Sequence, residues 1–383
     1  MFTIYCPTRI VFGLPVHEGL LSELRAAHVQ RVLLVSDPVV TSLEWFHQLR
    51  TALRASDYAV VVFSDVSSTP TTREVSEGLS LAQDERVQVV VGVGGGSVLD
   101  AAKAIAMLLT NGGSYAEYLH DGRAIQQRSR LMIAVPTTAG SGSEVTSSAL
   151  IADSGQAVTR SVRSPLMFPH VALIDPDLSR SLPPSTTAAT GISALVHALE
   201  AYVGRQTNPF VDPLAVTGMQ TVWSYLPRAF SAADDMTARQ AMLLAALWGG
   251  VCCDQAGAGM IEALAGALTA HLHLQLGLAR AIVLPHVLRF NLPAIPPVRR
   301  QRLNRTFGLS PEAGADDLVE RVAQFVHFLG LPAHLSALHV SASDYDWDAI
   351  AVEAAGAVSL TNNPREVSVD DCRSVLRQCC WDG

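Results

Sequence analysis

Short apolar runs rich in β-branched residues alternate with helical patterns through the first half of the chain. The runs predict five strands: Arg31–Val35, Ala59–Phe63, Val87–Val93, Leu131–Val135 and Val171–Ile174. Their near-continuous apolar character is typical of a parallel sheet that is buried on both faces. Between them, Val75–Gln83 and Val98–Leu109 have the spacing of helices. This alternation predicts an α/β, doubly wound fold.

The pattern changes after Asp175-Pro176, where strand signals almost disappear. Four long Ala/Leu-rich stretches are predicted as helices: Ala188–Val203, Pro213–Trp223, Ala238–Cys253 and Gly259–Leu274. A chain of 383 residues is long enough to bury two cores. We therefore expect an α/β domain at 1–180 and an all-helical domain at 181–383.

Composition excludes several classes of partner. The chain is 49% hydrophobic with a mean hydropathy of +0.26, but it has no run of about 18 apolar residues. The N-terminus lacks the basic start and apolar block of a signal peptide. A net charge of −8 argues against nucleic acid or an anionic membrane as partner. Six cysteines without CxxC spacing favour reduced thiols and a cytoplasmic location.

A glycine-rich turn stands between a strong strand and a helix. Gly92-Val93-Gly94-Gly95-Gly96-Ser97 follows the Val87–Val93 run and opens a helix beginning near Val98. Glycines let the backbone approach a pyrophosphate, and helix N-terminal amides supply hydrogen-bond donors. The pattern differs from the GxGxxG dinucleotide fingerprint, so a purely structural turn is an equal alternative.

Three further features favour a dinucleotide site. Asp37 stands just after the end of the Arg31–Val35 run, where a carboxylate can accept hydrogen bonds from a ribose. Thr137 and Thr138 follow another strand, within a stretch rich in hydroxyls and glycines. Asp100 and Lys103 fall on the helix that the glycines open. Ligands of open α/β sheets bind at the carboxyl ends of the strands.

Motifs spread over essentially the whole chain carry a family resemblance. In order they are PTRIVFG, GGGSVLDAAKAIA, PTTAGSGSEVT, ALIDPDL, ATGISALVHALEAYV, ARAIVLPHVLRFN and TNNPREVS. The chain resembles the iron-containing (group III) alcohol dehydrogenases, which have the dehydroquinate-synthase-like fold. The resemblance implies an N-terminal NAD(P)-binding α/β domain, a C-terminal helical domain and a cleft between them.

The resemblance also implies roles for the cofactor residues. Gly94, Gly95, Gly96 and Ser97 match the segment that contacts the pyrophosphate, and Thr137 and Thr138 match the pair beside the nicotinamide. Asp37 matches the acidic residue after the second strand, which favours NAD over NADP. Asp100 completes the set of residues that we expect to bind the cofactor.

The helical half departs from the family pattern. Metal-binding members carry Asp and His four apart in a TGxDALxHALEAY motif, and here Ser193 replaces the Asp while His197 is kept. The family's two further metal-binding His positions fall on Glu262 and Leu276, and an additional active-site His falls on Gly266. Neutral Ser is a poor ligand and Leu cannot coordinate. We therefore expect no divalent metal; His271, His273 and Asp254, which could rescue a site, lie outside the family positions.

Two ionisable groups are left for acid/base chemistry. A carboxylate beside an imidazole favours the imidazolium, so Glu262 is expected to make His197 a proton donor during hydride addition. The alternative is that the two side chains merely pair with each other. Arg160 and Arg163 could meet an anionic substrate, or could lie on a solvated surface loop.

Three functions stay open. The first is a metal-independent NAD(P)-dependent reductase of an aldehyde or ketone. The second is a repurposed cyclase, lyase or isomerase that retains a bound nicotinamide. The third is an inert NAD-binding protein, which the complete cofactor motifs disfavour. In each case the expected partner is a small molecule. The segment Phe2–Phe12 is predicted as an edge hairpin, and analogy with relatives favours a homodimer.

Overall fold

The structure of the chain is a computed structural model that describes residues 1–155, 159–338, 340 and 345–380. Contacts divide it into two compact units. The first, here called the α/β unit, comprises Ile4–Thr138 and Gly142–Ser179; the second, the helical unit, comprises Met1–Thr3, Ala139–Ser141 and Arg180–Gly383. The units thus divide between Ser179 and Arg180, and the short segment Ala139–Ser141 is counted with the helical unit although it follows a strand of the other.

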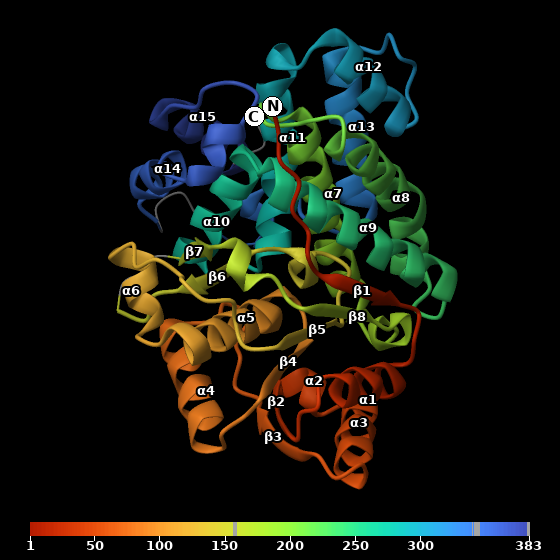
Figure 1. Ribbon diagram of the computed structural model, residues 1–383. Helices are drawn as coiled ribbons and strands as arrows, with labels where there is room; N and C mark the ends of the chain where they lie inside the picture. The colour runs from red at the N-terminus through yellow and green to blue at the C-terminus, as the bar shows by residue number, and fades with distance from the viewer. Residues whose placement is uncertain (156–158, 339, 341–344, 381–383) are drawn as a thin grey trace. The chain divides into compact units, whose positions relative to one another are not determined.

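The α/β unit is built on a six-stranded parallel sheet (Figure 1). Its strands run in the order β1-β8-β5-β4-β2-β3. Their bounds are Arg9–Phe12 (β1), Arg31–Val35 (β2), Ala59–Phe63 (β3), Val89–Gly94 (β4), Met132–Pro136 (β5) and Val171–Ile174 (β8). The predicted α/β class and parallel sheet are confirmed; β2, β3 and β8 have the predicted bounds, and β4 and β5 differ by one or two residues.

Two hydrophobic cores lie on opposite faces of this sheet. Within β4, Val90 belongs to one core while Val89 and Val91 belong to the other, as the alternation of a strand requires. Helices α4 (Thr72–Asp84) and α5 (Gly96–Asn111) contribute to the first core. Helices α1 (Val16–Ala26) and α3 (Glu44–Ala55) contribute to the second. Burial on both faces explains why these strands read as continuous apolar runs.

The N-terminal hairpin prediction is wrong. Only Arg9–Phe12 forms a strand, β1, and it pairs in parallel with β8 at the edge of the sheet. The hairpin in this unit is instead a separate two-stranded ribbon of β6 (Ser148–Ala152) and β7 (Thr159–Arg163). Arg160 and Arg163 lie on β7, opposite Ile151 and Ser148, rather than in a loop.

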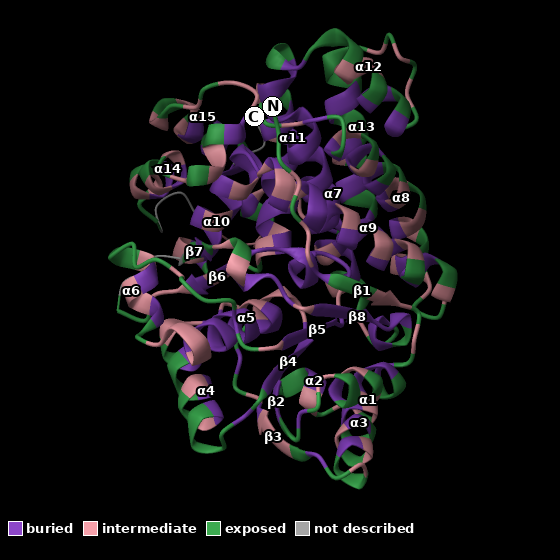
Figure 2. Ribbon diagram, viewed as in Figure 1, coloured by how far each residue is buried: buried purple, intermediate pink, exposed green. Residues whose placement is uncertain are grey.

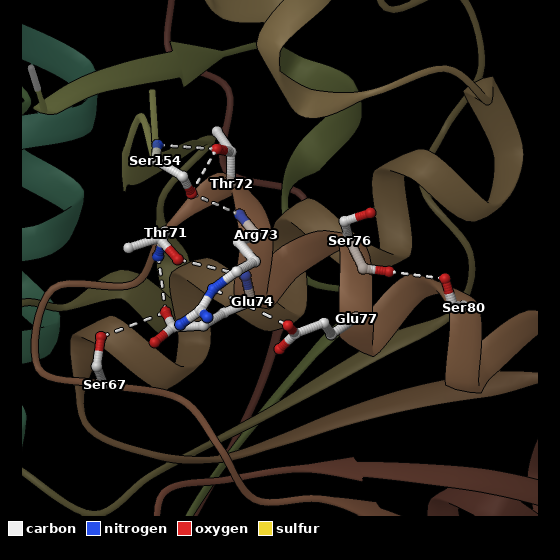
Figure 3. A network of polar contacts seen from close by, with 9 residues as sticks. All are labelled: Ser67, Thr71, Thr72, Arg73, Glu74, Ser76, Glu77, Ser80 and Ser154. Atoms are coloured by element: carbon white, nitrogen blue, oxygen red, sulfur yellow. Dashed lines mark hydrogen bonds and ion pairs between the residues drawn. The ribbon is translucent and has the colours of Figure 1, made fainter. Parts of the chain in front are cut away.

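Side-chain caps fix the start of α4 (Figure 3). Thr71 and Glu74 form a reciprocal capping box, in which each side chain accepts a hydrogen bond from the other residue's backbone. Ser154, which follows β6, accepts from the backbone N–H of Arg73 at 2.9 Å and donates its own N–H to Thr72 Oγ1 at 3.0 Å. The ribbon is therefore tied to the first turn of the helix. The remaining short helices of this unit are α2 (Pro38–Thr41) and α6 (Tyr115–His120).

Nine α-helices make up most of the described part of the helical unit. They are α7 (Pro184–Val203), α8 (Val211–Ser231), α9 (Met236–Ala256), α10 (Met260–Leu272), α11 (Leu276–Asn291), α12 (Pro297–Thr306), α13 (Ala315–Phe328), α14 (Trp347–Ala355) and α15 (Val369–Cys380). All four predicted helices are present, with different bounds. Helix α7 packs against α8, α9 and α11 and is buried along most of its length (Figure 2).

Among the described residues, no single helix is long and apolar enough to cross a membrane. Only α9 and α10 taken together meet that length and composition, and they are separated by a bend of 103°.

Candidate active site

The predicted cofactor residues gather at one edge of the sheet. Strands β2 and β5 flank β4 in parallel, so the segments that follow all three strands emerge at the same edge. The Thr137 N–H donates to the Gly94 carbonyl at 3.0 Å, which holds the threonine segment beside the glycines. After β2 the chain continues into α3, which packs on one face of the sheet, and after β4 it continues into α5, which packs on the other face. The strand order therefore changes direction between β2 and β4. Such switch points are where open α/β sheets bind ligands.

The glycine turn leaves the start of α5 open. Gly95 is the N-cap and no side chain caps the helix, which begins at Gly96 rather than near Val98. Its first backbone N–H groups therefore point outward with the positive end of a 16-residue helix behind them. A Cβ on Gly94 would lie 2.6 Å from the Val98 side chain, so this tight entry requires glycine. The geometry suits an anionic group such as a pyrophosphate.

Two further predicted residues flank this helix start. Thr138 lies against Gly95, because a Cβ added to Gly95 would be 3.4 Å from the Thr138 side chain. Asp37 follows β2 and caps α2, accepting from the Val40 N–H at 2.8 Å through Oδ1. Its Oδ2 has no partner among the described residues and the residue is half-buried, so one oxygen can accept from a ribose hydroxyl.

Asp100 and Ser97 are engaged within the protein. Asp100 accepts from Ser143 Oγ at 2.5 Å and from the Leu150 N–H at 2.9 Å, and it pairs with Lys103 at 3.0 Å. These contacts tie α5 to the segment that leads into β6. Ser97 Oγ donates to the Ser68 carbonyl at 2.6 Å. The backbone of Ser97 stays at the open helix start, whereas a direct cofactor contact of the Asp100 side chain stays a prediction.

In the helical unit, three helices bring together the positions that depart from the family pattern. Helix α7 carries Ser193 and His197 one turn apart, α10 carries Glu262, and α11 begins at Leu276. Ser193 Oγ donates to the Ala189 carbonyl at 3.2 Å, so its hydroxyl is satisfied within its own helix. His197 is buried; its ring donates to the Ser141 carbonyl, and Nδ1 has no partner among the described residues.

Glu262 pairs with a residue that the sequence analysis missed. Arg280 of α11 donates to Glu262 Oε2 through Nε at 2.8 Å and through Nη2 at 2.6 Å. Burial alone would raise the pKa of Glu262, but the Arg280 charge, the neighbouring His197 and the hydrogen bonds from Arg280 together outweigh it, so the pKa is lowered. The carboxylate is therefore ionised at neutral pH. The signal for Arg280 was present in the sequence as a lone arginine between alanines on an apolar helix.

His197 is neutral at physiological pH, contrary to the expected imidazolium. Burial, and then the charge of Arg280, lower its pKa to about 4, against the opposing effects of Glu262 and the Ser141 carbonyl. The expectation considered only the carboxylate and omitted the guanidinium that neutralises it. Because Glu262 pairs with Arg280, the alternative of a simple His197–Glu262 pair does not describe this cluster either.

Glu200, a second residue that the sequence analysis missed, lies one turn beyond His197 on α7. Its Oε1 accepts from the Ile261 N–H at 2.6 Å at the start of α10, while Oε2 is buried and no described residue bonds it. Burial and the nearby Glu262 charge raise its pKa to about 8, although the backbone amides of α10 lower it. The side chain is therefore mostly protonated at neutral pH.

These residues do not fit a divalent metal. Iron and zinc sites require about four oxygen, nitrogen or sulfur ligands. The donor set here reduces to one neutral imidazole and one carboxylate, and that carboxylate is neutralised by a buried guanidinium. Ser193 and Leu276 add no ligand. Arg280 also places a positive charge beside His197 and Glu262, which disfavours a dication there.

The three proposed rescue residues are engaged or placed elsewhere. His271 pairs with Glu353 at 2.7 Å, and His273 is an exposed residue in the left-handed C-cap of α10. Asp254 is buried on α9 and accepts from Gln255 at 2.8 Å. Within the described residues, no group of three or more His, Cys, Asp or Glu side chains is arranged to hold a metal ion.

An open glycine-lined helix start at a strand switch point is typical of dinucleotide-binding α/β proteins. Sequence profiles make the class specific: the profile of iron-containing alcohol dehydrogenase matches residues 7–176, and that of the Fe-containing alcohol dehydrogenase family, C-terminal, matches residues 187–380. The chain belongs to the iron-containing alcohol dehydrogenase family. It is thus an oxidoreductase of the alcohol dehydrogenase type, and the family resemblance is confirmed.

Individual relatives span the whole chain. The 1-propanol dehydrogenase of Salmonella typhimurium is 32% identical over 99% of this chain and 100% of its own length. The NAD-dependent methanol dehydrogenase of Bacillus methanolicus is 29% identical over 98% and 99%. A crystal structure of 1,3-propanediol oxidoreductase has a TM-score of 0.92 at 28% identity, covering 99% of this chain and 100% of that one. Sulfoacetaldehyde reductase from Bifidobacterium kashiwanohense, solved with NAD+, has a TM-score of 0.88 at 26% identity, covering 99% and 98%. Each of these four relatives covers at least 98% of this chain.

Proposed function

We propose that the chain catalyses the NAD(P)-linked interconversion of a small aldehyde or ketone and its alcohol without a divalent metal. NAD is favoured over NADP because Asp37 places a carboxylate after β2, where it can bond an unphosphorylated ribose and would repel a 2′-phosphate. Cofactor contacts are assigned to the segment Gly94–Ser97 and to Thr137 and Thr138, with Asp100 supporting α5. The relatives that act on short alcohols and aldehydes support a small substrate.

The observation that carries the metal-free assignment is the Glu262–Arg280 ion pair. A carboxylate that already neutralises a buried guanidinium is a weak ligand for a dication, and the guanidinium itself repels one. Leu276 and the back-bonded Ser193 leave His197 as the other donor among the four positions. The chemistry is therefore assigned to protein side chains alone.

We assign His197 and Glu262 distinct roles. In alcohol oxidation a hydride passes from the carbinol carbon to nicotinamide C4, and the hydroxyl proton passes to an acceptor. Neutral His197 offers Nδ1, which accepts from no donor in the described part of the chain, as that acceptor. In reduction the hydride bonds the carbonyl carbon, and the oxygen takes its proton back from His197 Nδ1, which is reprotonated from water. Glu262 remains ionised and holds its cationic neighbour.

The test is turnover by chelated protein. Protein dialysed against EDTA, with metal content verified below about 0.05 per chain, is mixed with NADH and a panel of C2–C4 aldehydes and ketones. We expect stoichiometric NADH oxidation and alcohol formation, unchanged by added Fe²⁺ or Zn²⁺. Activity that appears only with added metal would overturn the proposal. Turnover that leaves NADH unchanged would instead favour the non-redox alternative, and failure to bind either dinucleotide would defeat both. Dimer formation and a cytoplasmic location stay predictions made from the sequence.

A further inference from the structure

Arg280 is held rigidly inside the helical unit. Its side chain is only 6% exposed, and both Nε and Nη2 bond one oxygen, Oε2, of Glu262. Two donors converging on one carboxylate oxygen fix the plane of the guanidinium. The arginine therefore has a defined orientation before any ligand arrives.

Part of this ion pair is left unused by the protein. Within the described part of the chain, Nη1 of Arg280 and Oε1 of Glu262 have no hydrogen-bond partner, and neither atom is fully buried. One turn along α10 from Glu262, a Cβ added to Gly266 would meet no atom within 4 Å. Free space thus lies along the face of α10 that carries Glu262, next to a cation with spare donors.

The surrounding groups leave Arg280 as the cation of the cluster. His197 is neutral because burial and Arg280 itself lower its pKa to about 4. Burial raises the pKa of Glu200 to about 8 and raises the pKa of the Cys253 thiol, so both are mostly protonated at neutral pH. Glu262 is ionised as well, but it bonds Nε and Nη2, so an oxygen that gains negative charge beside Nη1 would meet the side of the guanidinium that the carboxylate does not occupy.

Building on the proposed function, we propose that Arg280 binds the carbonyl oxygen of the substrate through Nη1 and stabilises the alkoxide formed on hydride transfer. As the hydride from nicotinamide C4 bonds the carbonyl carbon, the π electron pair moves to the oxygen, and the cofactor is oxidised while the substrate is reduced. Arg280 holds that charge until a proton from water, relayed by His197, neutralises it. The arginine is a catalytic residue, and Glu262 is the positioning residue that orients it.

The experiment removes and restores the guanidinium. In Arg280→Ala we expect kcat/KM for aldehyde reduction to fall by about 100- to 1,000-fold, the usual effect of losing one oxyanion donor. The dissociation constant for NADH should change less than about threefold. Millimolar guanidinium chloride should raise kcat/KM of Arg280→Ala at least about tenfold. The matched control is Arg289→Ala on the same helix, an exposed arginine paired with Asp316, which should keep full activity with or without guanidinium.

A second variant separates catalysis from folding. Arg280→Ala leaves Glu262 without its partner, which alone can destabilise the helical unit. The double variant Arg280→Met with Glu262→Leu removes both charges, so its thermal midpoint should return toward that of the parent while its activity stays lost.

The outcomes distinguish this inference from the function on which it depends. If the chelated parent protein reduces no aldehyde, the proposed function fails and this inference fails with it. If the parent is active and a folded Arg280→Ala or double variant keeps kcat/KM within about threefold, the role of Arg280 is overturned and the proposed function stands. Recovery of activity in the charge-free double variant would show that the arginine is only structural.

Discussion

At the scale of single residues, the helical unit contains a carboxyl whose protonation is decided by its surroundings. Glu200 is buried on α7, accepts from the Ile261 N–H and lies near the charge of Glu262. Burial penalises the ionised form more than the α10 amides favour it, so its pKa rises to about 8. The folded protein thus retains a proton there that the unfolded chain would release near the ordinary pKa of 4.5.

The substitution Glu200→Gln tests this. Because the folded pKa is raised, the contribution of Glu200 to stability is fully present below about pH 4.5 and is lost as the pH rises through 8. The loss is about 1.4 kcal/mol for each pH unit between the two pKa values. Glutamine keeps an oxygen for Ile261 and does not titrate, so the variant should gain stability over the parent between pH 5 and pH 8.5.

Urea unfolding at a series of pH values measures the effect. The exposed Glu85→Gln is the control and should leave the pH dependence unchanged. If Glu200→Gln shows the same slope as the parent protein, the Glu200 carboxyl is ionised in the folded state and the assignment is wrong.

At the scale of elements, the close approach of helices decides which glycines can be replaced by alanine. Gly277, in the first turn of α11, faces α7 so closely that a Cβ would lie 2.4 Å from the Ala189 carbonyl oxygen. A backbone atom cannot move aside as a flexible side chain can. Gly266, in the middle of α10, has no atom within 4 Å of the same position. Two helical glycines therefore occupy opposite environments.

Replacing glycine by alanine should change the free energy of unfolding in opposite directions at these two positions. We expect Gly277→Ala to destabilise the protein by about 1–3 kcal/mol through overpacking. Gly266→Ala should stabilise it by about 0.5–1 kcal/mol, because alanine is the better helix former. Denaturant unfolding of each variant gives the values, and a Gly266→Ala variant less stable than its parent would show that no free space lies there.

Element prediction succeeded where the pattern is local and failed where it is not. Arg31–Val35, Ala59–Phe63 and Val171–Ile174 were predicted with their observed bounds because β-branched apolar runs form buried strands wherever the sheet places them. The segment before Phe12 was predicted as a hairpin, yet its last four residues pair with β8, more than 150 positions along the chain. The amphipathic pattern of an edge strand does not indicate which strand it pairs with.

At the scale of the whole molecule, the groups available for binding predict which ligands stabilise the folded protein. A ligand that binds only the folded state stabilises it by an amount set by its concentration relative to its dissociation constant. The open start of α5 presents backbone donors to a dinucleotide. The cluster of His197, Glu262 and Arg280 presents no comparable set to a metal ion.

Thermal unfolding should therefore respond to one ligand and not the other. NAD⁺ or NADH at 100 times its dissociation constant should stabilise the protein by about 2.7 kcal/mol and raise the midpoint accordingly. EDTA should leave the midpoint unchanged, and stoichiometric Fe²⁺ or Zn²⁺ should not raise it. A midpoint that falls with EDTA and recovers with metal would contradict the metal-free assignment, independently of any activity measurement.

The sequence by itself determined the fold class, the family and the positions at which this chain departs from it. These follow from local periodicity and from motif spacing, both of which are written along the chain. It also predicted that Ser193, Glu262 and Leu276 stand where the family carries metal ligands.

Only the tertiary structure decided what those departures form. Arg280 lies eighteen residues beyond Glu262, on the next helix, and their pairing depends on how α10 and α11 turn their side chains toward each other. The neutral state of His197 depends in turn on burial and on that guanidinium. Desolvation and charge act through space, so an imidazole that the sequence predicted as a cation is held neutral beside an arginine that carries the charge.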